Sequence, residues 1–196
     1  MNRPVLSSSA LVAALLFGGP PATAAPAAPA SGEAQASAPT SPTAMAVYEK
    51  AKAAAGKRSV FLAFHASWCL WCRALEKLTV LPATKPIFDR YYEVAWLTVD
   101  ERTSRKSLEN PGADELRTRI GGDGVALPFY AVVDAKGSVV ATSVRPGLDG
   151  KKENIGFPGT PDEVETFLAL FRAGAPDLTD SEEKALVNGI AALVKR

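Results

Sequence analysis

The stretch that decides the fold is residues 59–72, SVFLAFHASWCLWC. Residues 60–64 form a continuous apolar run with two aromatic side chains, which is typical of a buried β-strand, here expected over residues 59–65. A helix is expected to begin near Trp68 and to carry Cys69 and Cys72, the only two cysteines of the chain. The sequence therefore predicts a strand that leads directly into a helix, with a Cys-x-x-Cys pair at the junction.

This position gives the two sulfurs different chemistry. Unpaired backbone N–H groups and the helix macrodipole favour a thiolate at a helix N-terminus, so Cys69 should ionise more readily than a free cysteine. Cys72 lies one turn further on the same face, where it can attack a mixed disulfide formed at Cys69. A purely structural disulfide is the alternative, but closing a four-residue loop stabilises by only about 2 kcal/mol, against about 3 for fifteen residues.

The N-terminus has the pattern of a secretory signal. Arg3 supplies the positive charge, an apolar region runs from Val5 to Phe17, and residues 22–24 read Ala-Thr-Ala, a cleavage site. The apolar region falls short of the roughly 20 residues that span a bilayer. We therefore expect a signal peptide over residues 1–24, a flexible Ala/Pro-rich linker over 25–43 and one domain over 44–196, located in the periplasm or secreted.

Charge composition excludes some partners. The chain has 22 basic and 21 acidic residues, and loss of the signal would remove Arg3 and leave the two equal. Such a balance gives no reason to expect nucleic acid or an anionic membrane surface as a partner. We expect no stable membrane insertion of the mature chain.

The rest of the chain alternates helical and extended patterns. Two capping boxes, at Thr160/Glu163 and Thr179/Glu182, predict the starts of the last two helices. Residues 134–137 predict a hairpin turn, whereas residues 100–112 and 143–159 lack periodicity and are expected to be irregular. Further helices are expected at residues 44–55 and 114–120, and further strands at 93–99, 129–133 and 138–142.

These features together resemble the thioredoxin-like family. The resemblance covers about residues 44–173 and rests on the strand–Trp-Cys-x-x-Cys–helix unit and on Leu127-Pro128-Phe129 before the closing hairpin. It implies an α/β thioredoxin fold, a central mixed sheet flanked by helices, with additional N- and C-terminal helices. It also implies a cis Pro128, with the backbone of Leu127 pairing with an extended client. An ordinary trans proline at a strand edge is the alternative.

The match departs from thioredoxin itself. Thioredoxin has Gly-Pro between its cysteines and a buried Asp six residues before the first, where this chain has Leu70-Trp71 and Ala63. Glu76 lies one helical turn after Cys72, and the Cys-Arg-x-x-Glu pattern resembles exported members of the family. The resemblance suggests Glu76 as the group that shuttles the proton of Cys72. A solvated surface carboxylate, paired with Arg73 or Lys77, is an equally good interpretation.

Three more residues surround the pair. His65, the only histidine, could lower the pKa of the Cys69 thiol if its imidazolium reaches the sulfur, but it could equally cover the sheet. Trp68 and Trp71 flank the sulfurs and are expected to form an apolar collar for clients, with core packing as the alternative. Too few ligands accompany the cysteines for a structural zinc site, while copper(I) is less easily excluded.

We therefore predict an exported thiol–disulfide oxidoreductase that exchanges disulfides with protein clients through Cys69 and Cys72. The resemblance of the Cys-Arg-x-x-Glu pattern, which includes Glu76, to exported members of the family favours a reductase over an oxidant. It also implies a membrane-bound donor of reductant. No cofactor and no metal are expected. The alternative is a non-catalytic module of the same fold that binds copper(I) or acts as a chaperone for protein clients.

Overall fold

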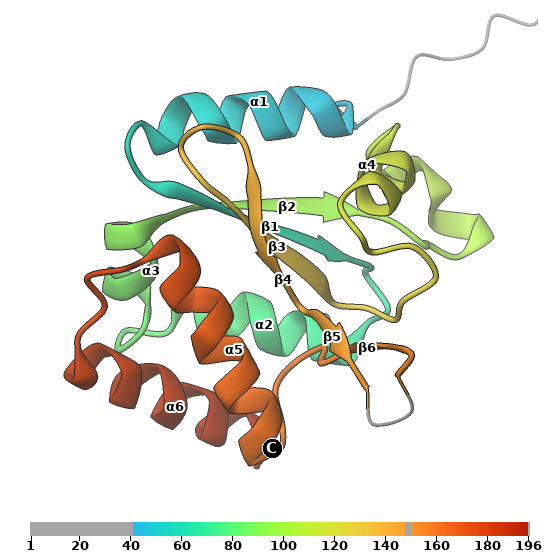
Figure 1. Cartoon of the computed structure of the whole chain (residues 1–196). Helices are drawn as coiled ribbons and strands as arrows, with labels where there is room; N and C mark the ends of the chain where they lie inside the picture. Colours follow the sequence, from blue (N-terminus) through green and yellow to red (C-terminus); the bar gives the residue numbers. More distant parts are fainter. Residues whose placement is uncertain (1–40, 148–149, 196) are drawn as a thin grey trace, which may run out of the picture. The chain divides into compact units, whose positions relative to one another are not determined.

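A computed structural model describes residues 41–147 and 150–195 of the chain. The predicted signal peptide, and the predicted linker up to residue 40, lie outside the described residues. A four-stranded sheet forms the centre, in the order β2-β1-β3-β4, with β1 and β2 parallel and the other pairs antiparallel (Figure 1). The strands are β1 Ser59–His65, β2 Tyr92–Thr98, β3 Phe129–Val133 and β4 Val139–Thr142.

Helices cover both faces of this mixed sheet (Figure 1). On one face α1 and α4 lie together, and on the other lie α2, α3, α5 and α6. The helices are α1 Ala44–Ala55, α2 Leu70–Val80, α3 Lys85–Tyr91, α4 Ala113–Arg119, α5 Pro161–Gly174 and α6 Asp180–Val194. This is the α/β thioredoxin fold that the sequence predicted, with a helix added at each end.

Strand alternation assigns the apolar side chains of β1 to two cores. Phe61 and Ala63 face the core shared with α2, α5 and α6, whereas Val60, Leu62 and Phe64 face α1 and α4. All five are at most 1% exposed, because β1 has a partner strand on each side and helices on each face. This burial on both faces explains why β1 reads as a continuous apolar run rather than as an alternating pattern.

Both predicted capping boxes are present. Thr160 accepts from the N–H of Glu163, whose carboxylate accepts from the N–H of Thr160, and the same reciprocal pair joins Thr179 and Glu182. These bonds satisfy N–H groups that have no partner inside the helix. Three apolar side chains of α6 are buried against the core. They are Leu186, Ile190 and Leu193.

Three details of the sequence prediction were wrong. Helix α2 begins at Leu70, so it carries only Cys72, and Cys69 is its N-cap. The expected irregular loop over 143–159 contains a two-stranded sheet of β5 Val144–Pro146 and β6 Lys152–Asn154. The expected irregular stretch 100–112 contains the 3-10 helix η1 Thr103–Leu108. These short elements have no buried residue and few apolar ones, so they leave no apolar period in the sequence.

Gly174, the last residue of α5, offers a test of the packing. A Cβ atom there would lie 2.6 Å from Val132 Cγ1 and 2.7 Å from the Tyr92 hydroxyl oxygen, and both neighbours are buried. We expect Gly174→Ala to lower the free energy of unfolding by about 1–3 kcal/mol, measured by urea denaturation. The control is Gly159→Ala, whose Cβ would be 3.7 Å from its nearest neighbour and should change stability by less than about 0.5 kcal/mol. Equal midpoints for the two variants would contradict this packing.

Candidate redox site

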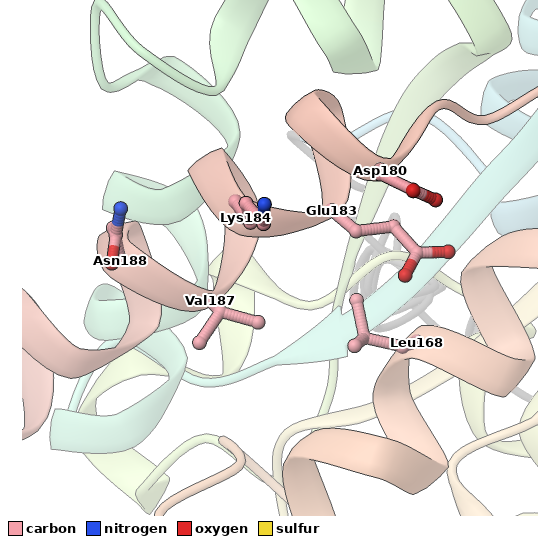
Figure 2. Close-up of a pocket in the computed structure, with 6 residues that line it drawn as sticks. All are labelled: Leu168, Asp180, Glu183, Lys184, Val187 and Asn188. Carbon is pink, nitrogen blue, oxygen red and sulfur yellow. The ribbon is translucent and has the colours of Figure 1, made fainter.

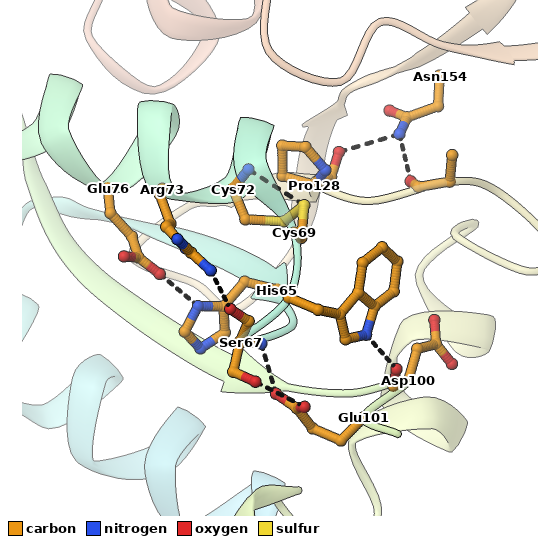
Figure 3. The surroundings of a disulfide bond; sticks show 12 residues. His65, Ser67, Cys69, Cys72, Arg73, Glu76, Asp100, Glu101, Pro128 and Asn154 are labelled. Carbon is orange, nitrogen blue, oxygen red and sulfur yellow. Dashed lines mark hydrogen bonds and ion pairs between the residues drawn. A yellow bond between two sulfur atoms is a disulfide. The ribbon is translucent and has the colours of Figure 1, made fainter. Parts of the chain in front are cut away.

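Cys69 and Cys72 form a disulfide at the N-terminus of α2 (Figure 3). Cys69 has extended backbone geometry, and its sulfur accepts a hydrogen bond of 3.1 Å from the backbone N–H of Cys72. The sulfur thus takes the place that a serine or aspartate oxygen takes at other helix N-caps. In the reduced protein this N–H and the helix dipole would act on a Cys69 thiolate, as the sequence predicted for that position.

The turn before Cys69 is held by a buried carboxylate. Glu101 follows β2, is 4% exposed, and accepts from both the backbone N–H and the hydroxyl of Ser67 (Figure 3). The side chains of Arg73 and Arg105 donate to the carbonyl and the hydroxyl oxygen of the same serine. Ser67 is therefore fixed through its backbone and its side chain, two residues before Cys69.

Trp68 is anchored to the same loop. Its indole N–H donates to the Asp100 carbonyl at 2.8 Å, and the Asp100 carboxylate pairs with the buried Arg117 at 2.6 Å. Asp100 has a backbone φ of 53°, in the left-handed region. Sequence reasoning missed Asp100 and Glu101. A usable signal was their position after β2, because the carboxyl ends of the parallel strands β1 and β2 meet at one edge of the sheet.

His65 and Glu76 contact each other. The imidazole Nδ1 lies 2.5 Å from Glu76 Oε1, and Nε2 lies 3.1 Å from the Thr98 hydroxyl (Figure 3). The alternative interpretation, a pairing of Glu76 with Arg73 or Lys77, is not what the structure has, because the Glu76 carboxylate contacts His65 on β1. Within residues 41–147 and 150–195, neither His65 nor Glu76 makes a hydrogen bond to a cysteine sulfur.

The disulfide is rimmed by exposed apolar side chains. Trp68, Leu70 and Trp71 are 45%, 69% and 47% exposed, although large apolar groups are usually buried. Core packing alone does not explain them, whereas Trp96 is partly buried and packs against the core. Leu70 was not singled out from the sequence. The three side chains therefore make the surface around the sulfurs apolar.

The segment before β3 completes the site. The Leu127–Pro128 peptide bond is cis, as the resemblance implied, and Leu127 packs against the cluster of Ala66, Cys69 and Cys72. Figure 3 shows the Pro128 ring beside the disulfide. No backbone group of Leu127 is hydrogen-bonded to another described residue. Among the described residues, its N–H and C=O therefore have no backbone partner.

Residues that follow β6 also contact residues of this site. The rings of Phe157 and Trp71 stack with 5.8 Å between their centres and 8° between their planes. The Tyr130 hydroxyl donates to the carbonyl of Gly156 at 2.9 Å. Burial raises the pKa of the Tyr130 hydroxyl well above its usual value, so the group stays protonated as a donor.

Outside the redox site, the described residues contain an open pocket but no cluster of metal ligands. An open pocket of about 440 Å³ lies along α5 and α6, far in the sequence from the cysteines and without any residue of the redox site (Figure 2). No group of three or more His, Cys, Asp or Glu side chains in the described ranges could hold a metal ion. Within those ranges, no helix is long and apolar enough to cross a membrane.

Comparison with known proteins gives structural neighbours only. No protein-family model and no curated protein matches the sequence. A disulphide isomerase from Xylella fastidiosa Temecula1 is 20% identical with a TM-score of 0.45, over 76% of this chain and 90% of that one. The DsbH oxidoreductase is 16% identical with a TM-score of 0.41, over 76% and 97% of the two chains.

A third neighbour is the C-terminal domain of DsbD from Neisseria meningitidis, in its oxidised form. It is 20% identical with a TM-score of 0.36, over 52% of this chain and 82% of that domain. Similarity at these levels does not carry an activity from those proteins to this chain.

The Glu101–Ser67 contact predicts a measurable loss of stability. Glu101→Ala removes the acceptor of two hydrogen bonds and leaves the Ser67 N–H without its partner, so we expect a loss of about 1.5–3 kcal/mol in urea unfolding. The control is Glu49→Ala on α1, whose exposed ion pair with Lys52 should contribute less than about 0.5 kcal/mol. A Glu101→Ala protein as stable as the control would show that the turn does not depend on this carboxylate.

Proposed function

We propose that the protein is an exported thiol–disulfide oxidoreductase that acts on protein clients. The observation that carries the proposal is the Cys69–Cys72 disulfide at a helix N-terminus, with the Cys69 sulfur as N-cap. A disulfide this close in sequence contributes little to stability, whereas the N-cap position favours a thiolate. Export rests on the signal pattern of residues 1–24, and the destination is the periplasm or the exterior.

The reaction needs only the two cysteines and a client disulfide. In the reduced protein the Cys69 thiolate attacks one client sulfur, and the second client sulfur leaves as a thiolate that takes up a proton. Cys72 then loses its proton and attacks the Cys69 sulfur of the mixed disulfide. The client leaves as a dithiol, two electrons have passed to it, and the Cys69–Cys72 disulfide has formed. A separate dithiol donor, which we propose to be membrane-bound, must then reduce this disulfide.

Clients would bind across the apolar rim and the segment before β3. Trp68 and Trp71, together with Leu70, offer apolar contact for side chains near the client disulfide. The free backbone of Leu127, next to Pro128, would pair with the client as a short added strand. Backbone pairing recognises an extended chain irrespective of its sequence, which suits a protein that acts on several clients.

Cys72→Ser and Cys69→Ser should behave differently. Cys72→Ser keeps the nucleophile but not the resolving thiol, so we expect a stable mixed disulfide with a model protein disulfide, seen by mass spectrometry under non-reducing conditions. Cys69→Ser should form none and should reduce the client no faster than buffer does.

Equilibration of the wild type with glutathione would give its reduction potential and hence its direction. A potential near that of thioredoxin, about −270 mV, supports a reductase, and one near −120 mV an oxidant. A pair that never cycles with glutathione would instead favour the non-catalytic alternative, a copper(I) or client-binding module.

We further propose that Glu76 accepts the proton of Cys72 and that His65 holds Glu76 in place. Because the His65 imidazole contacts Glu76 and makes no hydrogen bond to a cysteine sulfur among the described residues, its direct effect on Cys69 should be small. The reductase direction is preferred because this Cys-Arg-x-x-Glu pattern resembles exported members of the family.

Glu76→Gln keeps the size of the side chain but removes the proton acceptor. If Glu76 shuttles the proton, the rate of client reduction should fall by about 10²-fold and its pH profile should change shape. His65→Gln should change the rate of client reduction and its pH profile in the same direction as Glu76→Gln, but by a smaller amount. Glu165→Gln, on the exposed side of α5, is the matched control. An unchanged pH profile in Glu76→Gln would exclude the shuttle.

A further inference from the structure

The segment that follows β4 reaches back to the docking segment, residues 126–128. Asn154, the last residue of β6, donates from its side-chain amide to the carbonyl of Ala126 at 2.6 Å and to that of Pro128 at 2.9 Å (Figure 3). One amide group thus binds the backbone on both sides of Leu127. Nothing in the sequence indicated a role for this part of the chain.

The carbonyls that Asn154 binds, those of Ala126 and Pro128, belong to the residues on either side of Leu127. Leu127 itself makes no backbone hydrogen bond to a described residue, whereas the residues before and after it are held. A strand edge that is fixed in shape but still unpaired is what an added strand needs, because less conformational freedom is lost when the partner binds.

Asn154 is itself held firmly to the sheet. The N–H of Ile155 donates to the carbonyl of Ser143, and the N–H of Ser143 donates to the carbonyl of Tyr130 on β3. The Ser143 hydroxyl, fully buried, accepts from the N–H of Tyr130 at 3.1 Å. The position of the Asn154 amide is therefore tied to β3, the strand that follows the docking segment directly.

The chemistry of the Asn154 side chain fits this role and few others. Its Oδ1 atom is buried and has no partner among the described residues, so the side chain acts only as a donor here. The amide NH₂ offers two N–H groups and meets two carbonyl oxygens. An aspartate in this place would bring a carboxylate against two acceptors.

We infer that Asn154 is a positioning residue for client binding, which fixes the backbone of residues 126–128 so that Leu127 can pair with an extended polypeptide. The inference rests on the proposed function and names a residue that would make the enzyme prefer protein and peptide disulfides. A small disulfide has no peptide backbone to pair with Leu127, so it would not benefit from Asn154. The β5–β6 sheet and Asn154 would then set the affinity for clients and leave the cysteine chemistry unchanged.

The test compares two substrates with the full-length reduced protein. One is a disulfide-linked peptide, and the other is 2-hydroxyethyl disulfide, which has no peptide backbone to dock. For Asn154→Ala we expect kcat/KM with the peptide to fall about tenfold, mainly through KM, because two hydrogen bonds to the docking segment are lost. The rate with 2-hydroxyethyl disulfide should stay within twofold of the wild-type rate. The reduction potential should equal that of the wild type within experimental error.

Asn110→Ala is the matched control. Asn110 also binds backbone through both ends of its amide, accepting from the N–H of Thr98 at 2.7 Å and donating to the carbonyl of Pro42 at 2.9 Å. Asn110 lies outside the docking segment. Its replacement should therefore not lower kcat/KM for the peptide more than it lowers the rate with 2-hydroxyethyl disulfide. If Asn154→Ala does not fold, Asn154→Ser, whose hydroxyl is too short to bind both carbonyls, should give the same split.

An equal loss with both substrates, or no loss with either, would overturn the inference while the proposed function stands. A wild-type protein that exchanges with neither substrate would overturn the proposed function itself. The two failures are therefore distinguishable in one set of measurements.

Discussion

Burial of β1 on both edges and both faces is the constraint on which the rest of the site depends. The strand pairs in parallel with β2 and antiparallel with β3, and its apolar side chains are divided between two cores. Such a strand cannot shift by one residue without turning every side chain to the wrong core. Its carboxyl end is therefore a fixed point, and the disulfide follows that end after only three residues.

The site is held from two sides. On one side, the loop after β2 fixes Ser67 through Glu101 and Trp68 through Asp100. On the other side, Asn154 fixes the backbone around Leu127, and Phe157 stacks on Trp71. These contacts hold backbone groups, the Ser67 hydroxyl and the two tryptophan rings, and they leave the apolar rim exposed.

Different residues of the site contact the cysteines and the docking segment. The N-cap bond to the Cys69 sulfur bears on the reactivity of the cysteines, and the His65–Glu76 contact bears on where protons could go. The contacts of Asn154 bear on the docking segment alone. Reactivity and client affinity would thus be set by separate residues, so that one could change in evolution without the other.

By itself, the sequence determined the features that depend on neighbours along the chain. These features are the apolar run of β1, the helix that carries Cys72, and both capping boxes of α5 and α6. Local periodicity and N-cap chemistry define them. The redox pair and the candidate docking proline were also found, since family motifs mark them. The start of α2 was misplaced, because an N-cap cysteine differs from a helical one in backbone geometry alone.

The tertiary structure alone decided which polar side chains meet. Glu101 and Ser67 are 34 residues apart, Asn154 and Ala126 are 28 apart, and His65 reaches Glu76 instead of a sulfur. No local pattern records these pairs, because a carboxylate or an amide has the same propensities whatever it binds across the fold. The β5–β6 sheet was missed for the same reason, since its short polar strands are held by backbone pairing and by contact with β3.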